Sequence, residues 1–305
     1  MGAANVIPGV SGGTIAFVTG IYDELIDALK AFNLEAIKLL LSFKIKAFLL
    51  HINAMFLISL FIGAVTGIIS LGKLFKWVIS LDRTTDNDII AHGYEPVLFA
   101  LFFGLILASV YYVGRTIKNW NVKTIVAGLL GMVVAIGLVL VKPSSENDHA
   151  LYLFICGIVA MSSMLLPGLS GSFVLILMGN YYLIMIDSVQ NFDGKVLGIV
   201  GAGAIIGFII LSRLISFLLI KFEDITISSL TGFIFGSLVT IWPWKTILRE
   251  SIKKGDKVKE VITGYEGWYF PEMNTYDYLL VAMMFFGFAM VWGIEFIGKL
   301  SKKNN

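Results

Sequence analysis

Glycine and hydroxyl residues that could bind an anion occur twice in the sequence, each time after a Pro-Gly pair. The motif PGVSGGT at 8–14 is followed by GIY at 20–22, and PGLSGS at 167–172 is followed by GNY at 179–181. Proline removes a backbone donor and glycine relaxes the backbone, so each motif should interrupt a helix. Where the helix resumes, backbone N–H groups lack partners and hydroxyl side chains lie beside them. This arrangement suits an anion, and phosphate in particular.

The anion site predicted from these motifs combines both copies with one arginine. Arg213 is included because it lies inside the segment 196–220, which is otherwise uncharged, and an unpaired charge there is costly. Arginine also pairs well with phosphate. The predicted phosphate-binding residues are Ser11, Gly12, Gly13, Thr14, Ser170, Gly171, Ser172 and Arg213.

These assignments have structural alternatives. Ser11 and Ser170 could instead cap the resumed helices, while the glycines allow close helix packing. Arg213 could extend to the membrane interface, because Lys221 marks the end of its segment.

Three further charged residues are secondary candidates: Lys73, Glu24 and Glu295. Glu24 follows the first motif and Glu295 lies inside the last apolar segment, so either could couple transport to H⁺ or Na⁺. Their alternative is solvation near a helix end. The three histidines lack metal-ligand spacing, and no nucleophile set accompanies the motifs. We therefore expect no metal site, no other cofactor and no enzymatic activity.

The composition is that of an integral membrane protein. Of the residues, 57% are hydrophobic and only 14% are charged, whereas soluble domains carry about a quarter charged residues. The net charge of +2 gives no indication of nucleic-acid binding. The single cysteine, Cys156, cannot form a disulfide within the chain.

Apolar segments long enough to span a membrane are predicted at about 52–72, 97–114, 124–141, 196–220, 227–244 and 278–298. Residues 150–186 are also uncharged, but a straight helix of that length would run about 55 Å, against a membrane core of about 30 Å. With Pro167-Gly168 near its middle, this segment is predicted to be a re-entrant hairpin. Residues 24–47 mix apolar side chains with lysines and predict a helix lying on the membrane. Residues 245–276 predict an exposed loop.

The two halves of the chain repeat each other in order. The motif at 8–22 shares six of 15 residues with 167–181, and IGAVTGIISLGK at 62–73 shares five of 12 with AGAIIGFIILSR at 202–213. The second alignment pairs Lys73 with Arg213, and a weaker third match pairs Gly104 with Gly236. This order predicts a duplication, with one repeat at 1–148 and the other at 149–305.

The predicted fold is an all-α integral membrane protein with an inverted structural repeat. Each half would hold one re-entrant hairpin, broken at PGxSG, and three transmembrane helices. A hairpin returns to its own side and three spans do not, so the second half must be inverted, as in secondary transporters. The first hairpin would lack most of the arm that precedes its break. The loop 115–123 and the C-terminus are basic without acids, which favours a cytoplasmic position for both.

With PGVSGGT before GIY and PGLSGS before GNY, the chain resembles a bacterial and archaeal family associated with polyprenyl-phosphate (undecaprenyl-phosphate) translocation, formerly a domain of unknown function. The resemblance implies a multi-pass transporter that returns this carrier lipid across the cytoplasmic membrane after cell-wall assembly. It also implies that the residues at 8–14 and 167–172 form the phosphate site. The second copy departs from the first, because Ser172-Phe173 replaces Gly13-Thr14.

A transporter or channel for a small soluble anion, such as sulfate or phosphate, is the alternative function. The same polar centre would serve it, and only the access route, from lipid or from water, would differ. The oligomeric state, the coupling ion and the direction of net transport stay open.

Overall fold

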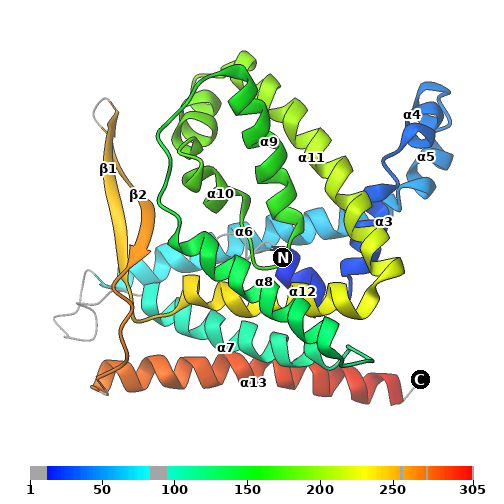
Figure 1. Cartoon of the computed structure of the whole chain (residues 1–305). Helices are drawn as coiled ribbons and strands as arrows, with labels where there is room; N and C mark the ends of the chain where they lie inside the picture. The colour runs from blue at the N-terminus through cyan, green and yellow to red at the C-terminus, as the bar shows by residue number, and fades with distance from the viewer. Residues whose placement is uncertain (1–11, 83–94, 255–256, 273, 304–305) are drawn as a thin grey trace.

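In the computed structural model, the described residues are 12–82, 95–254, 257–272 and 274–303. Their long helices form a bundle (Figure 1). Five segments are long and apolar enough to cross a membrane, and up to seven are if each bent helix pair counts as one span. The long helices are α6 (Ala54–Asp82), α7 (Glu95–Gly114), α8 (Val122–Leu140), α11 (Gly194–Lys221), α12 (Glu223–Ser237) and α13 (Thr275–Lys303). These helices match the six predicted segments.

The helix α8 packs along α12 in the parallel direction. Ser228 Oγ donates a 2.7 Å hydrogen bond to the carbonyl of Thr124, and further along both helices Gly236 lies against the backbone of Met132. A Cβ at Gly236 would overlap Met132. The two helices therefore approach at backbone contact distance, which small residues permit.

The helix α7 packs along α13 in a similar way, side by side in Figure 1. Ala100 and Leu280 share one buried cluster, and Gly104 lies against the backbone of Met284. A Cβ at Gly104 would overlap the Met284 carbonyl. From Ala100 to Gly104 on α7, the contacted residue on α13 moves from Leu280 to Met284. Both helices therefore run in the same direction.

A third close pair joins α11 to α9 (Ala150–Leu165). Gly203 lies against the Phe154 carbonyl and Gly207 against the Ile158 carbonyl, with no room for a Cβ. On α6, by contrast, a Cβ at Gly63 would meet no described atom within 4 Å. The GxxxG spacing on α11 therefore serves packing inside the chain.

Residues 24–47 form parts of three short helices rather than the single predicted helix. They are α3 (Tyr22–Lys30), α4 (Leu34–Leu41) and α5 (Ile45–His51). The Asn33 side chain caps α4 by accepting the N–H groups of Glu35 and Ala36 at 2.9 and 3.1 Å. Phe43 adopts a φ of 55° between α4 and α5. The prediction of one continuous helix was wrong because an internal Asn cap starts a new helix.

The predicted exposed loop at 245–276 contains two antiparallel strands, β1 (Thr246–Lys254) and β2 (Lys257–Glu266). They project away from the helices in Figure 1. Their base is fixed by indole hydrogen bonds: Trp242 donates to the Tyr269 carbonyl at 3.0 Å and Trp244 to Asp277 Oδ1 at 2.7 Å. The prediction of an all-α fold is therefore correct for the apolar part of the chain but not for 245–276, which contains these two strands.

Candidate functional site

The segment 150–186 folds back on itself at the PGLSG motif. The helix α9 ends at Leu165, and α10 (Gly171–Leu177) begins after an irregular stretch. Gly168, within that stretch, has a φ of +89°, a conformation that favours glycine. Pro167 and Gly168 are both buried. The break therefore lies inside the protein, where irregular backbone is tolerated within a membrane.

The far ends of α9 and α10 meet at one end of the hairpin. Asn180 is fully buried, accepts the Asn147 N–H at 2.9 Å and donates to the Asn147 carbonyl at 2.7 Å. Ser144 N–H donates to the Leu177 carbonyl at 2.8 Å, and Tyr152 O–H donates to the Met178 carbonyl at 2.8 Å. After α10 the chain bends by 113° into a π-helix, η1 (Tyr182–Ser188). The chain therefore folds back on itself between α9 and α10.

The two copies of the motif end in the same turn. Gly20 has a φ of +72° and Gly179 a φ of +74°. Ile21 N–H donates to the Ala16 carbonyl at 3.0 Å, and Asn180 N–H donates to the Leu175 carbonyl at 3.0 Å. A six-residue hydrogen bond closed by a left-handed glycine is a common helix ending. The conformation therefore repeats at the positions that the sequence aligns.

The first motif contacts the break of the second. Tyr22 O–H donates a 2.8 Å hydrogen bond to the Leu165 carbonyl, where α9 ends. Ala16, on α2 (Gly12–Val18), belongs to the same buried cluster as Tyr22 and Leu165. The fold therefore brings the segments after the two predicted anion motifs to one region.

The predicted site residues have different surroundings. Ser11 lies outside the described residues, Gly12 and Gly13 are buried at the start of α2, and Thr14 follows them in that helix. Ser170 and Ser172 flank the buried Gly171, and their hydroxyls are 2.7 Å apart. Ser170 makes no side-chain cap of α10. The capping alternative therefore does not describe Ser170.

Arg213 does not join the serines of the second motif. Its side chain is exposed on α11. Within the described part of the chain, no hydrogen bond or ion pair links it to Ser170 or Ser172. An exposed arginine near the end of an apolar helix is placed to extend toward the interface.

The secondary candidates are dispersed as well. Lys73 is exposed on α6. Glu24, also exposed, accepts a 2.9 Å hydrogen bond from Asn53 Nδ2. Glu295 lies in α13, and the structure describes only its backbone. Among the described residues, no group of three His, Cys, Asp or Glu residues could hold a metal ion.

A small cavity lies beside the break in the hairpin. Its volume is about 10 Å³, which is room for about one water molecule. The hairpin contributes one wall, and α12 with the following 3₁₀ helix η2 (Leu238–Ile241) contributes another. The polar or conformationally special lining residues are Gly168, Ser170, Ser237 and Thr240. Ser237 and Thr240 are not among the residues predicted from the sequence, although both lie in the apolar segment 226–240, which is rich in Ser and Thr, and this composition is an identifiable signal.

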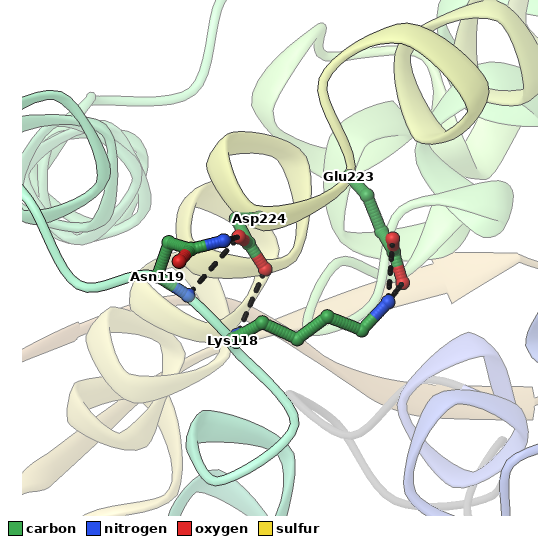
Figure 2. Close-up of polar contacts among 4 residues, drawn as sticks. All are labelled: Lys118, Asn119, Glu223 and Asp224. Atoms are coloured by element: carbon green, nitrogen blue, oxygen red, sulfur yellow. Dashed lines mark hydrogen bonds and ion pairs between the residues drawn. The ribbon is translucent and has the colours of Figure 1, made fainter.

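A polar cluster joins the loop before α8 to the start of α12 (Figure 2). Lys118 Nζ lies 2.9 Å from Glu223 Oε2. Asp224 accepts the backbone N–H groups of Lys118 and Asn119 at 2.9 and 3.1 Å. The hydrogen bond and charge of Glu223 raise the pKa of Lys118. This cluster places the starts of α8 and α12 at the same end of the bundle.

That placement fixes the path of the chain between the halves. The helix α11 ends at Lys221, beside this cluster, and α8 begins there. The chain between α8 and α11 therefore starts at the end of α8 that lies away from this cluster and finishes at the start of α11, which also lies away from it. The return of the chain from α9 into α10 agrees with this path.

Sequence comparisons give consistent matches. The family model VCA0040-like, described as undecaprenyl phosphate translocase-like, matches residues 1–258. A Vibrio cholerae protein named polyprenyl-phosphate transporter is 34% identical over 300 residues, which cover 97% of this chain and 93% of the relative. A Staphylococcus aureus protein of the same name is 32% identical over 268 residues, covering 80% of this chain and 83% of that relative. No solved structure matches the chain at a significant level.

Proposed function

The chain belongs to the undecaprenyl phosphate translocase-like family, and on this basis we propose that it moves a polyprenyl phosphate carrier lipid across the cytoplasmic membrane. The observation that carries the proposal is the match to relatives named polyprenyl-phosphate transporter, which extends along nearly the whole chain. The multi-pass helical bundle agrees with it. The proposal also states that the lipid is undecaprenyl phosphate and that its transport recycles it for the cell wall. The proposed mechanism is not enzymatic.

The proposed architecture is an inverted repeat. Gly104 and Gly236, which the sequence aligns, lie against the backbones of Met284 and Met132. In each case the second long helix of one half packs on the third long helix of the other. The equal turns at Gly20 and Gly179 support the same relationship. Two inverted halves can rock against each other and open a central site to either side in turn.

The proposed phosphate site is formed by the two motifs, at Ser11–Thr14 and Ser170–Ser172. The helices that follow the motifs, α2 and α10, have only seven residues each, so their dipoles add little compared with those of longer helices. The hydroxyl groups of these segments would provide most of the recognition. The prenyl tail would stay in the lipid.

Arg213 remains a proposed contact for a different conformation of the transporter. On α11 it is exposed in the present arrangement, so it would meet the phosphate only after α11 moves relative to the hairpin. An arginine near the interface can attract a lipid phosphate before it reaches the centre. Coupling to H⁺ or Na⁺ is likewise a proposal, with Glu24 and Glu295 as candidates.

The proposed function can be tested in liposomes that contain the purified protein. A labelled polyprenyl phosphate would be placed in one leaflet and its arrival in the other followed with time. We expect wild-type protein to exceed protein-free liposomes, and Ser170→Ala/Ser172→Ala to slow movement about tenfold. Thr116→Ala is a matched control, because Thr116 is exposed and its hydroxyl bonds only the Val113 carbonyl.

Sulfate and inorganic phosphate flux, measured in the same liposomes, distinguish the alternative function. Lipid movement without sulfate or phosphate flux supports the lipid transporter. Sulfate or phosphate flux without lipid movement would reject it in favour of a small-anion transporter or channel that uses the same polar centre.

A further inference from the structure

The cavity beside Gly168 has hydroxyl groups on two walls. Ser170 lies on the hairpin wall, and Ser237 and Thr240 lie on the opposite wall. A Cβ at Gly168 would lie 3.1 Å from Ser237 Oγ, so the hairpin and α12 nearly touch here. None of the described residues that line the cavity is charged. The cavity therefore suits a group that is recognised through hydrogen bonds.

Thr240 is the unusual member of this lining. Only 4% of its surface is exposed, and its hydroxyl makes no hydrogen bond within the described part of the chain. In that same part, no fully enclosed polar side-chain atom lacks a partner. The Thr240 hydroxyl is therefore not fully enclosed, and Thr240 lines the cavity. A buried hydroxyl without a protein partner needs a ligand or water to satisfy it.

Ser237 differs from Thr240 in having one protein partner. Its hydroxyl donates to the Ile234 carbonyl at 2.8 Å, within its own helix. Its oxygen still has lone pairs that can accept a hydrogen bond. Ser170 and Ser172 share a 2.7 Å contact and could exchange it for bonds to a ligand. Hydroxyl-bearing residues thus line both sides of a space with room for about one water.

We propose that Ser237 and Thr240 of the α12 wall form the second side of the phosphate head-group site, opposite Ser170 of the hairpin. This inference rests on the proposed function and adds residues that the motifs do not contain. Thr240 would donate to a phosphate oxygen, and Ser237 would accept from a protonated one. In the present arrangement the space has room for about one water and is too small for a phosphate ester, so the hairpin would move away from α12 when the head group enters.

The central test replaces Thr240 by valine, which removes the hydroxyl and keeps the shape. Thr231→Val is the matched control, because Thr231, on α12, is buried like Thr240 on η2 but its hydroxyl donates to the Ile227 carbonyl within the helix. We expect Thr240→Val to raise the apparent KM for polyprenyl phosphate about tenfold. Thr231→Val should keep the wild-type KM, and Thr240→Ser should restore it. An unchanged KM in Thr240→Val would overturn the assignment.

A binding measurement separates this inference from the transport function. A short-chain prenyl phosphate would be added to purified protein, and the rise in melting temperature recorded. We expect the rise in wild type and Thr231→Val, and a right-shift of the titration by about tenfold in Thr240→Val. The same midpoint in Thr240→Val, or no rise in wild type, would reject the site. Wild-type protein that binds this ligand but moves no lipid would contradict the transport function and keep the site.

Correct folding of each variant is checked by its melting temperature in the absence of ligand. Thr240→Val should melt at the wild-type temperature, because valine fills the same volume and removes a hydroxyl that bonds no described residue. If it melts lower, Ser237→Ala replaces it in both measurements. Ser237→Ala should then raise the KM and shift the titration, and wild-type values for this variant would overturn the proposal.

Discussion

Tyr22 donates its hydroxyl to the carbonyl of Leu165 over 2.8 Å, and so joins the turn after the first motif to the break of the second. Only 2% of Tyr22 is exposed. Burial raises the pKa of this phenol far above its ordinary value, so it stays a neutral donor at any physiological pH. The hydrogen bond couples two segments that lie 143 residues apart in the chain.

Tyr22→Phe should lower stability and slow transport, because it leaves a buried carbonyl without this donor. The expected loss is about 1–2 kcal/mol, seen as a lower melting temperature in detergent. Tyr278→Phe, at an exposed position on α13, should melt like wild type. Equal melting of Tyr22→Phe and wild type would contradict the structural role of this hydrogen bond.

Asn180→Ala should destabilise the second hairpin more strongly. It removes both hydrogen bonds with Asn147 at a fully buried position. We expect a loss of about 2–3 kcal/mol and faster proteolysis at 141–149, which is exposed. Asn191→Ala, at an exposed site that bonds Asp187, is the control and should have little effect. If Asn180→Ala and Asn191→Ala were proteolysed at similar rates, the Asn180 hydrogen bonds would not stabilise the hairpin as proposed.

Cysteines at positions 118 and 223 should be joined by a reducible bifunctional thiol reagent, because the long side chains of Lys118 and Glu223 meet at one end of the bundle. The background is Cys156→Ser, which removes the single native cysteine. If the two halves of the protein move relative to each other during transport, the crosslink should slow lipid movement at least tenfold. Cleaving the crosslink with a reducing agent should restore the movement. Crosslinked protein with full activity would contradict movement of the halves at this end of the bundle.

Impermeant thiol labelling can test the path of the chain with the same background. Single cysteines at 118 and 223 should be labelled from one side of the membrane. Single cysteines at 146 and 193, before and after the hairpin, should be labelled from the other. Labelling of 118 and 223 from opposite sides would exclude the re-entrant hairpin.

Gly236→Leu should destabilise the protein by several kcal/mol, because its side chain would overlap the backbone of α8 and overpacking alone costs about 1–3 kcal/mol. Gly104→Leu should do the same at α13. Gly63→Leu is the control, since a Cβ there meets no described atom within 4 Å. Thermal melts in detergent measure all three, and equal melts would show that these contacts contribute little.

Asp23→Asn should stabilise the protein at neutral pH. Burial, together with the nearby charges of Asp27 and Glu223, raises the pKa of Asp23. The folded state therefore favours the protonated form, and its stabilisation is present at low pH and lost as the pH rises through the raised pKa. Melting curves should differ between Asp23→Asn and wild type at pH 7 and converge below about pH 4, where the carboxyl is protonated in both the folded and the unfolded state. Equal melting temperatures of the two proteins at pH 7 would contradict this prediction.

The long helices and the hairpin could be predicted because each depends on a local pattern. Uninterrupted apolar residues set the spans, and Pro167-Gly168 marks a break in a segment too long to cross once. The division of 24–47 into parts of three helices was not predicted, because the sequence does not show that the Asn33 side chain caps α4. The strands at 246–266 were missed because mixed charges suggested a loop.

The candidate site was harder to predict than the fold. Arg213 was chosen for the cost of its charge in an apolar segment, but the direction of a side chain around a helix depends on packing partners elsewhere. For the same reason, the sequence alone does not predict the position of Thr240. Its chemistry was visible in the sequence, but only the parallel packing of α12 and its approach to the hairpin place it beside Gly168.

The exchange of helix partners between the halves has a consequence for biosynthesis. Ser228 on α12 follows its partner Thr124 on α8 by 104 residues, which at roughly 5–20 residues per second is a delay of about 5–20 seconds. During that time the glycine faces of α7 and α8 lack their native neighbours. The newly inserted first half must therefore be shielded by the insertion machinery or by lipid until α12 and α13 leave the ribosome. Two half-length chains produced in the same cell would, for the same reason, each be exposed to quality-control proteases until they found each other.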